Sequence, residues 1–140
     1  LMLLKTRQKV NTRQRVDTVY ECSPVVVMDP HHFRQILWNL LVNALEAMPE
    51  GGDLVVSVVP CNGSESQKLA EARIDVRDTG GGIPEDVRER LFEPFFTTKK
   101  NGTGLGLSIV YQLVETAQGR LQVFSSEPTG TTFSLFFPIV

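Results

Sequence analysis

Asn101-Gly102-Thr103-Gly104-Leu105-Gly106-Leu107 sets three glycines among small and apolar residues, and an amphipathic pattern follows at once. The apolar stripe predicts a helix over about 104–117 that Gly119 ends. Glycine lets the backbone approach a ligand closely, and a helix start directs free N–H groups and a positive dipole end into the preceding loop. Phosphate suits such a loop. The same residues also suit an ordinary turn before a helix, so by itself the stretch leaves both interpretations open.

Length and composition indicate one globular domain. The chain has 140 residues, of which 41% are hydrophobic and 21% are charged. Its net charge of −2 argues against a basic surface for nucleic acid, and no apolar run approaches the roughly 20 residues that span a bilayer. We therefore expect a cytoplasmic location. The sequence does not begin with Met, so we also expect a fragment of a longer protein, with any membrane anchor elsewhere in that protein.

Cysteine usage fits the same expectation. Cys22 and Cys61 lie far apart, without a C-x-x-C pattern or a nearby pair of histidines. A zinc site or a disulfide framework is therefore not expected, and reduced thiols are.

The order of patterns predicts a linker or the tail of an upstream helical domain over 1–14, and one folded domain over 15–140. A helix should begin with Asp29 as N-cap and Pro30 at its first position. The expected elements are an edge strand over 15–20, a buried strand over 25–28, a helix over 30–48, paired strands over 54–59 and 73–77 joined by a polar connector over 60–70, a short helix over 85–91, the helix over 104–117, and strands over 121–125 and 131–138. This order indicates an α/β (α+β) two-layer sandwich, a mixed sheet with helices on one face.

A polar stripe runs along the helix over 30–48. Asn39, Asn43 and Glu46 fall at i, i+4 and i+7 against a broad leucine-rich face. The stripe is either an exposed polar edge or a row of amide oxygens facing a cleft, where neutral oxygen ligands suit Mg²⁺.

Asp78 ends a predicted strand and precedes Thr79 and three consecutive glycines. A carboxylate beside open backbone can accept a hydrogen bond from an amino group. The alternative is a turn aspartate that satisfies its own backbone.

The segment Phe92-Glu93-Pro94-Phe95-Phe96-Thr97-Thr98-Lys99-Lys100 is apolar but interrupted by proline. It suits a lid that packs in one state and moves in another, or an aromatic cluster filling the core beneath a loop. Its two lysines either reach phosphates or remain solvated.

Several other nucleotide and hydrolase motifs are missing from the sequence. It contains no G-x-x-x-x-G-K-[ST], no G-x-G-x-x-G and no G-x-S-x-G. These absences argue against a P-loop, a dinucleotide fingerprint, a protein-kinase glycine loop and a serine hydrolase.

Taken together, residues 25–139 resemble the ATP-binding catalytic domain of sensor histidine kinases, within the superfamily of gyrase, heat-shock chaperone and mismatch-repair ATPases. The four matching boxes, in order, are Asn39-Leu40-Leu41-Val42-Asn43-Ala44 (N box), Asp78-Thr79-Gly80-Gly81-Gly82-Ile83 (G1 box), Phe92-Glu93-Pro94-Phe95-Phe96-Thr97-Thr98-Lys99 (F box) and Gly102-Thr103-Gly104-Leu105-Gly106-Leu107 (G2 box). Gly130-Thr131-Thr132-Phe133 is similar to the closing strand.

The resemblance implies a mostly antiparallel sheet and a Bergerat-type ATP site with a mobile lid over about 92–103. It implies Asn43 as the Mg²⁺ ligand, Asn39 as a phosphate or metal-water contact, and Asp78 as the acceptor for the adenine amino group, with Thr131 assisting through water. The other implied contacts of ATP are Gly80, Gly82 and Ile83 around the purine, and Lys99, Gly102, Thr103, Gly104, Leu105, Gly106 and Leu107 around the triphosphate.

One position separates the subclasses of the superfamily. Its ATP hydrolases carry a glutamate base four residues before the metal asparagine, where this chain has Asn39. An amide cannot accept a proton at neutral pH, so we expect transfer of the γ-phosphoryl group to a histidine instead of hydrolysis.

The implied acceptor histidine lies outside this chain, on a dimerisation domain of the same protein. His31 and His32 do not sit in the acceptor pattern and are expected to be ordinary residues of a first helical turn. A response regulator receiver domain would be the downstream partner. The alternatives are an ATP-hydrolysing clamp like the topoisomerases, and a serine kinase of the anti-sigma type or a module that only senses nucleotide.

Overall fold

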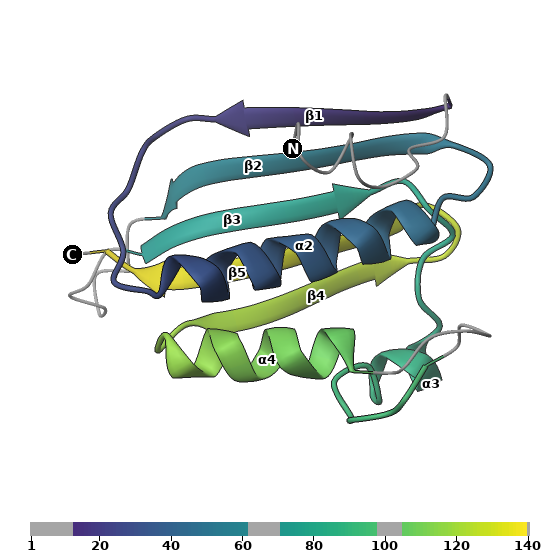
Figure 1. The fold of residues 1–140 in the computed structure, drawn as a ribbon. Helices are drawn as coiled ribbons and strands as arrows, with labels where there is room; N and C mark the ends of the chain where they lie inside the picture. Colours follow the sequence, from purple (N-terminus) through teal and green to yellow (C-terminus); the bar gives the residue numbers. More distant parts are fainter. Residues whose placement is uncertain (1–12, 62–70, 98–104, 140) are drawn as a thin grey trace.

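The computed structural model describes residues 13–61, 71–97 and 105–139. Its sheet has five strands in the order β1-β2-β3-β5-β4 (Figure 1). The strands are β1 (Gln14–Tyr20), β2 (Gly52–Cys61), β3 (Glu71–Asp78), β4 (Arg120–Ser126) and β5 (Gly130–Pro138). β1 is parallel to β2, and the other neighbours are antiparallel. The predicted mixed sheet, the edge strand and the hairpin of β2 with β3 are confirmed.

Two long helices cover one face of this sheet. They are α2 (Pro30–Glu46) and α4 (Gly106–Thr116), and the short α3 (Glu85–Arg88) lies beyond the start of α4 (Figure 1). The Asp29 carboxylate accepts a hydrogen bond from the His31 N–H over 2.8 Å, so the predicted cap is confirmed. No helix among the described residues has the length and apolar character needed to cross a membrane.

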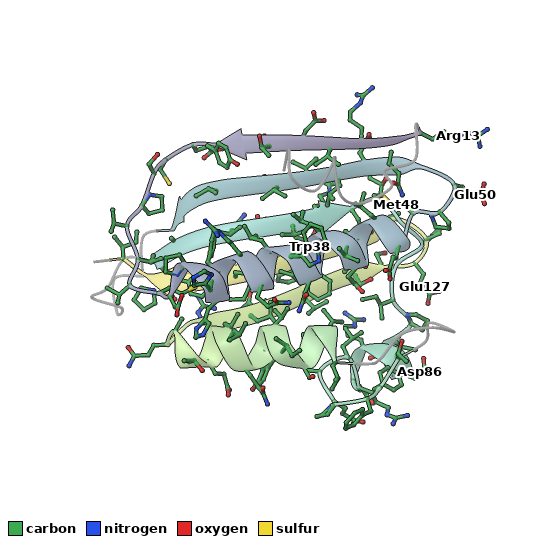
Figure 2. All side chains as sticks on the ribbon, in the orientation of Figure 1. Arg13, Trp38, Met48, Glu50, Asp86 and Glu127 are labelled. Carbon is green, nitrogen blue, oxygen red and sulfur yellow. The ribbon has the colours of Figure 1, made fainter. Side chains whose placement is uncertain are left out.

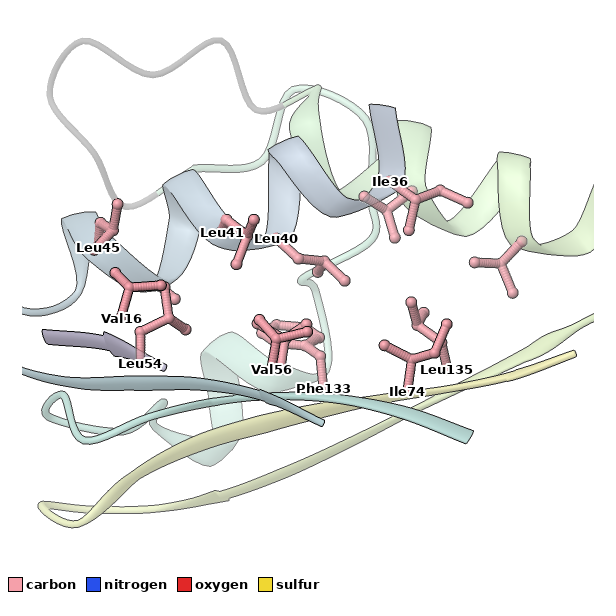
Figure 3. Close-up of a cluster of buried hydrophobic side chains, with 14 of the residues drawn as sticks. Val16, Ile36, Leu40, Leu41, Leu45, Leu54, Val56, Ile74, Phe133 and Leu135 are labelled. Atoms are coloured by element: carbon pink, nitrogen blue, oxygen red, sulfur yellow. The ribbon is translucent and has the colours of Figure 1, made fainter. Parts of the chain in front are cut away.

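The core lies between the helices and the sheet, where the apolar faces of the helices pack against the apolar face of the strands (Figure 3). In β3, Ile74 and Val76 face the helices, whereas Arg73 and Asp75 alternate with them. α2 contributes Ile36 and Leu40, both fully buried. Each such side chain stabilises the fold by about 1.5–3 kcal/mol relative to leaving it in water.

β1 begins at Gln14 and is tied to the far end of α2. The Gln14 side-chain amide donates to the carbonyl oxygens of Leu45 and Met48 over 2.9 and 2.8 Å. Both carbonyl oxygens also accept a backbone hydrogen bond, from the N–H groups of Met48 and Gly51, so Gln14 adds a second donor to each. Residues 1–12 lie outside the described part, so their assignment to an upstream linker stays a prediction.

The prediction of a buried strand over 25–28 is wrong. The chain there forms no strand, and the side chains of Val25 and Val27 are 67% and 78% exposed. Val26 and Met28 are half-buried and pack against the core. The segment crosses from the edge strand β1 to α2 at one end of the sheet (Figure 1), and no strand of the described ranges pairs with it. The alternating side chains thus pack on one side of the segment, as in a strand, but its backbone has no strand partner among the described residues.

Other boundaries also differ from the predictions, and α2 ends at Glu46, two residues before the expected end. α3 ends at Arg88, three residues before the expected end, and turns follow it. β2 continues to Cys61 into the predicted connector, of which residues 62–70 lie outside the described part.

Candidate functional site

Asp78 ends β3 as a buried carboxylate on the core side of the sheet. It pairs in register with Thr131 of β5, and the two residues are only 3% and 5% exposed. Its Oδ1 accepts a hydrogen bond from the Gly80 N–H over 2.9 Å, and the Thr131 backbone N–H also donates to it. Burial raises the pKa of the carboxyl, and the two backbone hydrogen bonds oppose that rise. The site therefore contains an acceptor held by fixed backbone donors.

Two glycines after Asp78 allow close backbone contact. A Cβ at Gly80 would lie 2.6 Å from the carbonyl oxygen of Ala47, at the end of α2. A Cβ at Gly82 would lie 2.7 Å from the carbonyl oxygen of Ser126, and the φ of Gly82 is +79°. Gly80 thus fits the loop against α2 and Gly82 fits it against the β4–β5 hairpin.

Thr79 anchors the start of the same loop, although the sequence did not single it out. Its hydroxyl oxygen accepts from the Asp53 N–H over 2.9 Å and lies 3.7 Å from the Met48 sulfur. Met48 lies at the end of α2, between the helix and the strands (Figure 2). Thr79 therefore ties the loop to both β2 and α2.

Ser125 is another residue that the sequence reasoning missed. Its Oγ accepts from the Ile83 N–H over 2.7 Å and lies 2.9 Å from the Thr131 Oγ1. The signal was available, since Ser125 occupies the third core-facing position of β4 after the partly buried Leu121 and Val123. A hydroxyl at an apolar position of a strand indicates a buried polar partner.

Asn39 joins α2 to α4. Its Nδ2 donates to the Gly106 carbonyl oxygen over 3.1 Å, and its Oδ1 accepts from the Gln35 Nε2 over 2.8 Å. Asn43 lies one turn further along and is half-buried, whereas Glu46 is exposed. The predicted stripe therefore faces the neighbouring helix at Asn39 and reaches solvent at Glu46.

The phenylalanines of the F box occupy three different environments. Phe92 packs against the core and against Tyr111, with ring centroids 5.6 Å apart. Phe95 is 75% exposed with a φ of +67°, and Phe96 lies under the Arg90 guanidinium at 4.5 Å. The segment is thus not one aromatic core cluster.

The start of α4 is described from Leu105 onward. The Leu105 carbonyl oxygen accepts from the Ser108 hydroxyl over 2.9 Å, and Leu107 packs partly buried against the core. Lys99, Gly102, Thr103 and Gly104 lie outside the described residues, so their contacts with phosphate stay predictions. Within the described ranges, no three His, Cys, Asp or Glu side chains gather as a metal cage.

The family model for the "Histidine kinase-, DNA gyrase B-, and HSP90-like ATPase" matches residues 28–140. The sequence is 36% identical over 129 residues to sporulation kinase E of Bacillus subtilis (strain 168), covering 92% of this chain and 16% of the kinase. It is 40% identical over 122 residues to the sensor histidine kinase ZraS of Escherichia coli (strain K12), covering 87% and 25%. The chain thus spans a quarter or less of these relatives.

Solved structures agree with the sequence relatives. The mycobacterial sensor histidine kinase MprB superposes with a TM-score of 0.80 at 28% identity, covering 98% of this chain and 89% of that one. The catalytic domain of histidine kinase ThkA gives a TM-score of 0.78 at 29% identity, covering 98% and 87%. Full-length ShkA in complex with AMPPNP gives a TM-score of 0.78 at 27% identity, covering 99% of this chain and 28% of the ShkA chain.

Proposed function

The chain belongs to the histidine kinase-, DNA gyrase B- and HSP90-like ATPase family, and we propose that it is the ATP-binding catalytic domain of a two-component sensor histidine kinase. The observation that carries this proposal is the buried Asp78 carboxylate beside the Gly80–Gly82 turn, in a fold that superposes on sensor histidine kinases. The relatives compared above are a sporulation kinase and a sensor histidine kinase.

The adenine ring would bind between the Gly80–Gly82 turn and Thr131. Asp78 would accept a hydrogen bond from the adenine amino group, since its carboxylate keeps lone pairs beyond those used by Gly80 and Thr131. Ile83, half-buried against the core, would supply an apolar wall. This arrangement of apolar surface and few polar groups is typical of small-molecule sites.

Mg²⁺ and the triphosphate would bind at the other end of the site. Because the described residues offer no acidic cage, the ion would take the amide oxygen of Asn43, phosphate oxygens and waters, as Mg²⁺ commonly does. Bound Mg²⁺ neutralises charge on the phosphates. The loop residues Lys99 and Gly102–Gly104 would enclose the triphosphate, with Leu105, Gly106 and Leu107 continuing into α4.

The γ-phosphoryl group would pass to a histidine on a dimerisation domain of the same protein, and from there to a response regulator in the cytoplasm. Asn39 cannot remove a proton from water, and its amide is already engaged by Gln35 and Gly106. Phosphoryl transfer needs positioning and charge stabilisation more than a base. An amide at position 39, in place of a carboxylate base, also disfavours an ATP-hydrolysing clamp.

The test is to incubate the chain with radiolabelled Mg-ATP, alone and with a histidine-bearing dimerisation domain in trans. We expect little phosphate release from the chain alone and an acid-labile phosphohistidine on the added domain. Rapid hydrolysis that Asn39→Ala abolishes would overturn the proposal in favour of the clamp. Absence of phosphohistidine would favour a serine kinase or a nucleotide-sensing module.

A further inference from the structure

A hollow of about 360 Å³ lies where the β4–β5 hairpin and β3 meet α3. The side chains that line it from the face of the sheet opposite the long helices, or from α3, include Arg77, Arg88, Phe124 and Thr132. Asp78 and Thr131 also line the hollow, but their side chains are buried on the helix side, because successive residues of a strand face opposite ways. The hollow and the proposed adenine site therefore lie back to back.

Arg77, Thr132 and Phe124 form one row across three neighbouring strands. Thr132 of β5 pairs in register with Arg77 of β3 on one side and with Phe124 of β4 on the other. Adjacent strands lie about 4.8 Å apart, so the row spans about 10 Å. Thr132 is half-buried at its centre, whereas Arg77 is exposed and Phe124 is 58% exposed. A small ligand can therefore bridge the guanidinium group and the aromatic ring.

Two positive side chains face this hollow without an acidic partner among the described residues. The guanidinium groups of Arg77 and Arg88 take part in no hydrogen bond or ion pair there, whereas Arg73 pairs with Asp75 over 2.8 Å. The Thr132 hydroxyl has no partner within the same ranges. A guanidinium is a planar fork of N–H donors that matches the oxygens of phosphate. The hollow thus offers two such forks and a hydroxyl to an oxyanion.

The neighbouring hollow on the same face of the sheet has a different charge. It measures about 490 Å³ and shares Arg77 and Thr132 with the first, but Asp53 and Asp75 line it as well. Their carboxylates would repel an anion. We therefore expect oxyanion binding only at the hairpin end of the face, where Arg88 adds a second positive charge.

We propose that the hollow beside the hairpin binds a small aromatic phosphate monoester, with its phosphate between Arg77 and Arg88 and its ring against Phe124. Such a phosphate carries a charge of about −1.5 to −2 at neutral pH, which matches two guanidinium groups better than one carboxylate does. The volume of the hollow lies within the range of small-molecule sites. The inference does not depend on the proposed binding of ATP on the other face of the sheet.

Phenyl phosphate, inorganic phosphate and benzoate test the two halves of the site, because the second probe lacks the ring and the third carries only one charge. In an NMR titration of the chain, we expect phenyl phosphate to shift the amides that line the hollow. It should bind about two- to tenfold more tightly than inorganic phosphate, the range of one aromatic contact, and more tightly than benzoate. Without shifts at these amides the proposal fails.

Arg77→Gln and Arg88→Gln should each weaken binding of phenyl phosphate by about tenfold or more, the range of a hydrogen bond between charged groups. Arg15→Gln is the matched control, since Arg15 is exposed on the same face at β1 and lies outside the hollow. This control should bind like the wild type. An equal loss in Arg15→Gln would show that only the general charge of the face attracts the anion, and would overturn the proposal.

Phe124→Val tests the contact with the ring at a position whose exposure makes the change mild for the fold. The variant should bind inorganic phosphate like the wild type and should lose the preference for phenyl phosphate. A preference that survives in Phe124→Val would contradict the proposed seat of the ring and overturn the proposal of an aromatic ligand.

Saturation with Mg-AMPPNP separates this inference from the proposed function. The shifts that phenyl phosphate causes at the hollow should persist, since the two sites lie on opposite faces of the sheet. Loss of these shifts would mean that the oxyanion occupies the nucleotide site, which overturns the inference and leaves the proposed function standing. If Mg-AMPPNP does not bind at all, the proposed function fails, and the arginine and Phe124 variants alone decide the inference.

Discussion

The side-chain amide of Asn39 donates to the Gly106 carbonyl oxygen over 3.1 Å, although 67 positions separate the two residues in the sequence. A carbonyl oxygen can only accept, so this contact orients the amide and turns its Oδ1 toward the Gln35 Nε2. Gly106 is the first residue of α4, immediately after the predicted triphosphate loop. Asn39 thereby holds the end of that loop to the helix that carries Asn43.

Asn39→Asp should loosen this attachment. The carboxylate has nearly the same shape but cannot donate, and it would face the Gly106 carbonyl oxygen. We expect faster hydrogen exchange at the first amides of α4 and about two- to tenfold weaker ATP binding, the range of one lost hydrogen bond. Exchange mass spectrometry and calorimetry measure the two effects.

Gln122→Glu makes the same amide-to-acid change at an exposed position of β4 and should alter neither quantity. Unchanged exchange at the start of α4 in Asn39→Asp would show that the Asn39–Gly106 bond does not hold the helix.

The pKa of Asp78 should make stability depend on pH. Burial raises this pKa above its ordinary value of 3.8, so the native state binds the proton more tightly than the unfolded state. The contribution of Asp78 to the free energy of unfolding therefore falls as pH rises from the ordinary pKa through the raised one, and stays low at neutral pH. Asp78→Asn removes this contribution. Urea unfolding at several pH values measures the free energy of unfolding of both proteins. The value for the wild type minus that for Asp78→Asn should decrease as pH rises over that window.

Nucleotide binding should respond in the opposite direction, because the adenine amino group needs the ionised carboxylate. Wild-type ATP affinity is expected to fall as pH drops through the raised pKa of Asp78. At neutral pH, Asp78→Asn should weaken binding by about 1.5–3 kcal/mol, the range of a hydrogen bond to a charged group. A stability difference that is flat with pH would contradict the raised pKa, and equal affinities would contradict the role in binding.

The glycine loop offers a test with a neighbouring control. Gly82→Ala forces an alanine to a φ of +79° with its Cβ 2.7 Å from the Ser126 carbonyl oxygen. We expect a loss of about 1–3 kcal/mol of stability from the strained backbone, together with weaker ATP binding as the loop shifts. At Gly81 nothing lies within 4 Å of the position that a Cβ would occupy, so Gly81→Ala should change stability by less than about 0.5 kcal/mol. Chemical denaturation measures both stabilities. Equal losses for Gly82→Ala and Gly81→Ala would contradict the close contact of Gly82 with the Ser126 carbonyl oxygen.

The sequence predicted the sheet and helices well, because helix caps and periodicity are local. Asp29 and Pro30 indicated the start of α2, and the apolar Ile74 and Val76 indicated β3. The register that brings Asp78 opposite Thr131 depends on strands more than fifty residues apart, and no local pattern contains it. The motif resemblance supplied that proximity instead.

Within the site, the sequence indicated residues that a ligand would contact but missed those that hold them. Thr79 and Ser125 bond to partners far along the chain, and Gln35 bonds to Asn39 one turn along α2. Their residue types are common in exposed positions, so composition gave no warning. Only the core-facing place of Ser125 on β4 was a usable signal.

The mistaken strand over 25–28 leads to a last prediction about stability. A buried strand would make each of its valines costly to replace with serine. In the structure, Val26 packs against the core, whereas Val27 is 78% exposed. Val27→Ser should therefore change the free energy of unfolding by less than about 0.5 kcal/mol. Val26→Ser should lower it by about 1 kcal/mol or more, since half of a valine side chain leaves an apolar contact.

Leu54→Ala, at a fully buried position of β2, sets the scale with an expected loss of about 2–5 kcal/mol. Urea denaturation of the three variants measures these values. Equal losses at Val26 and Val27 would mean that both side chains are buried, and that the segment pairs with a partner outside the described residues.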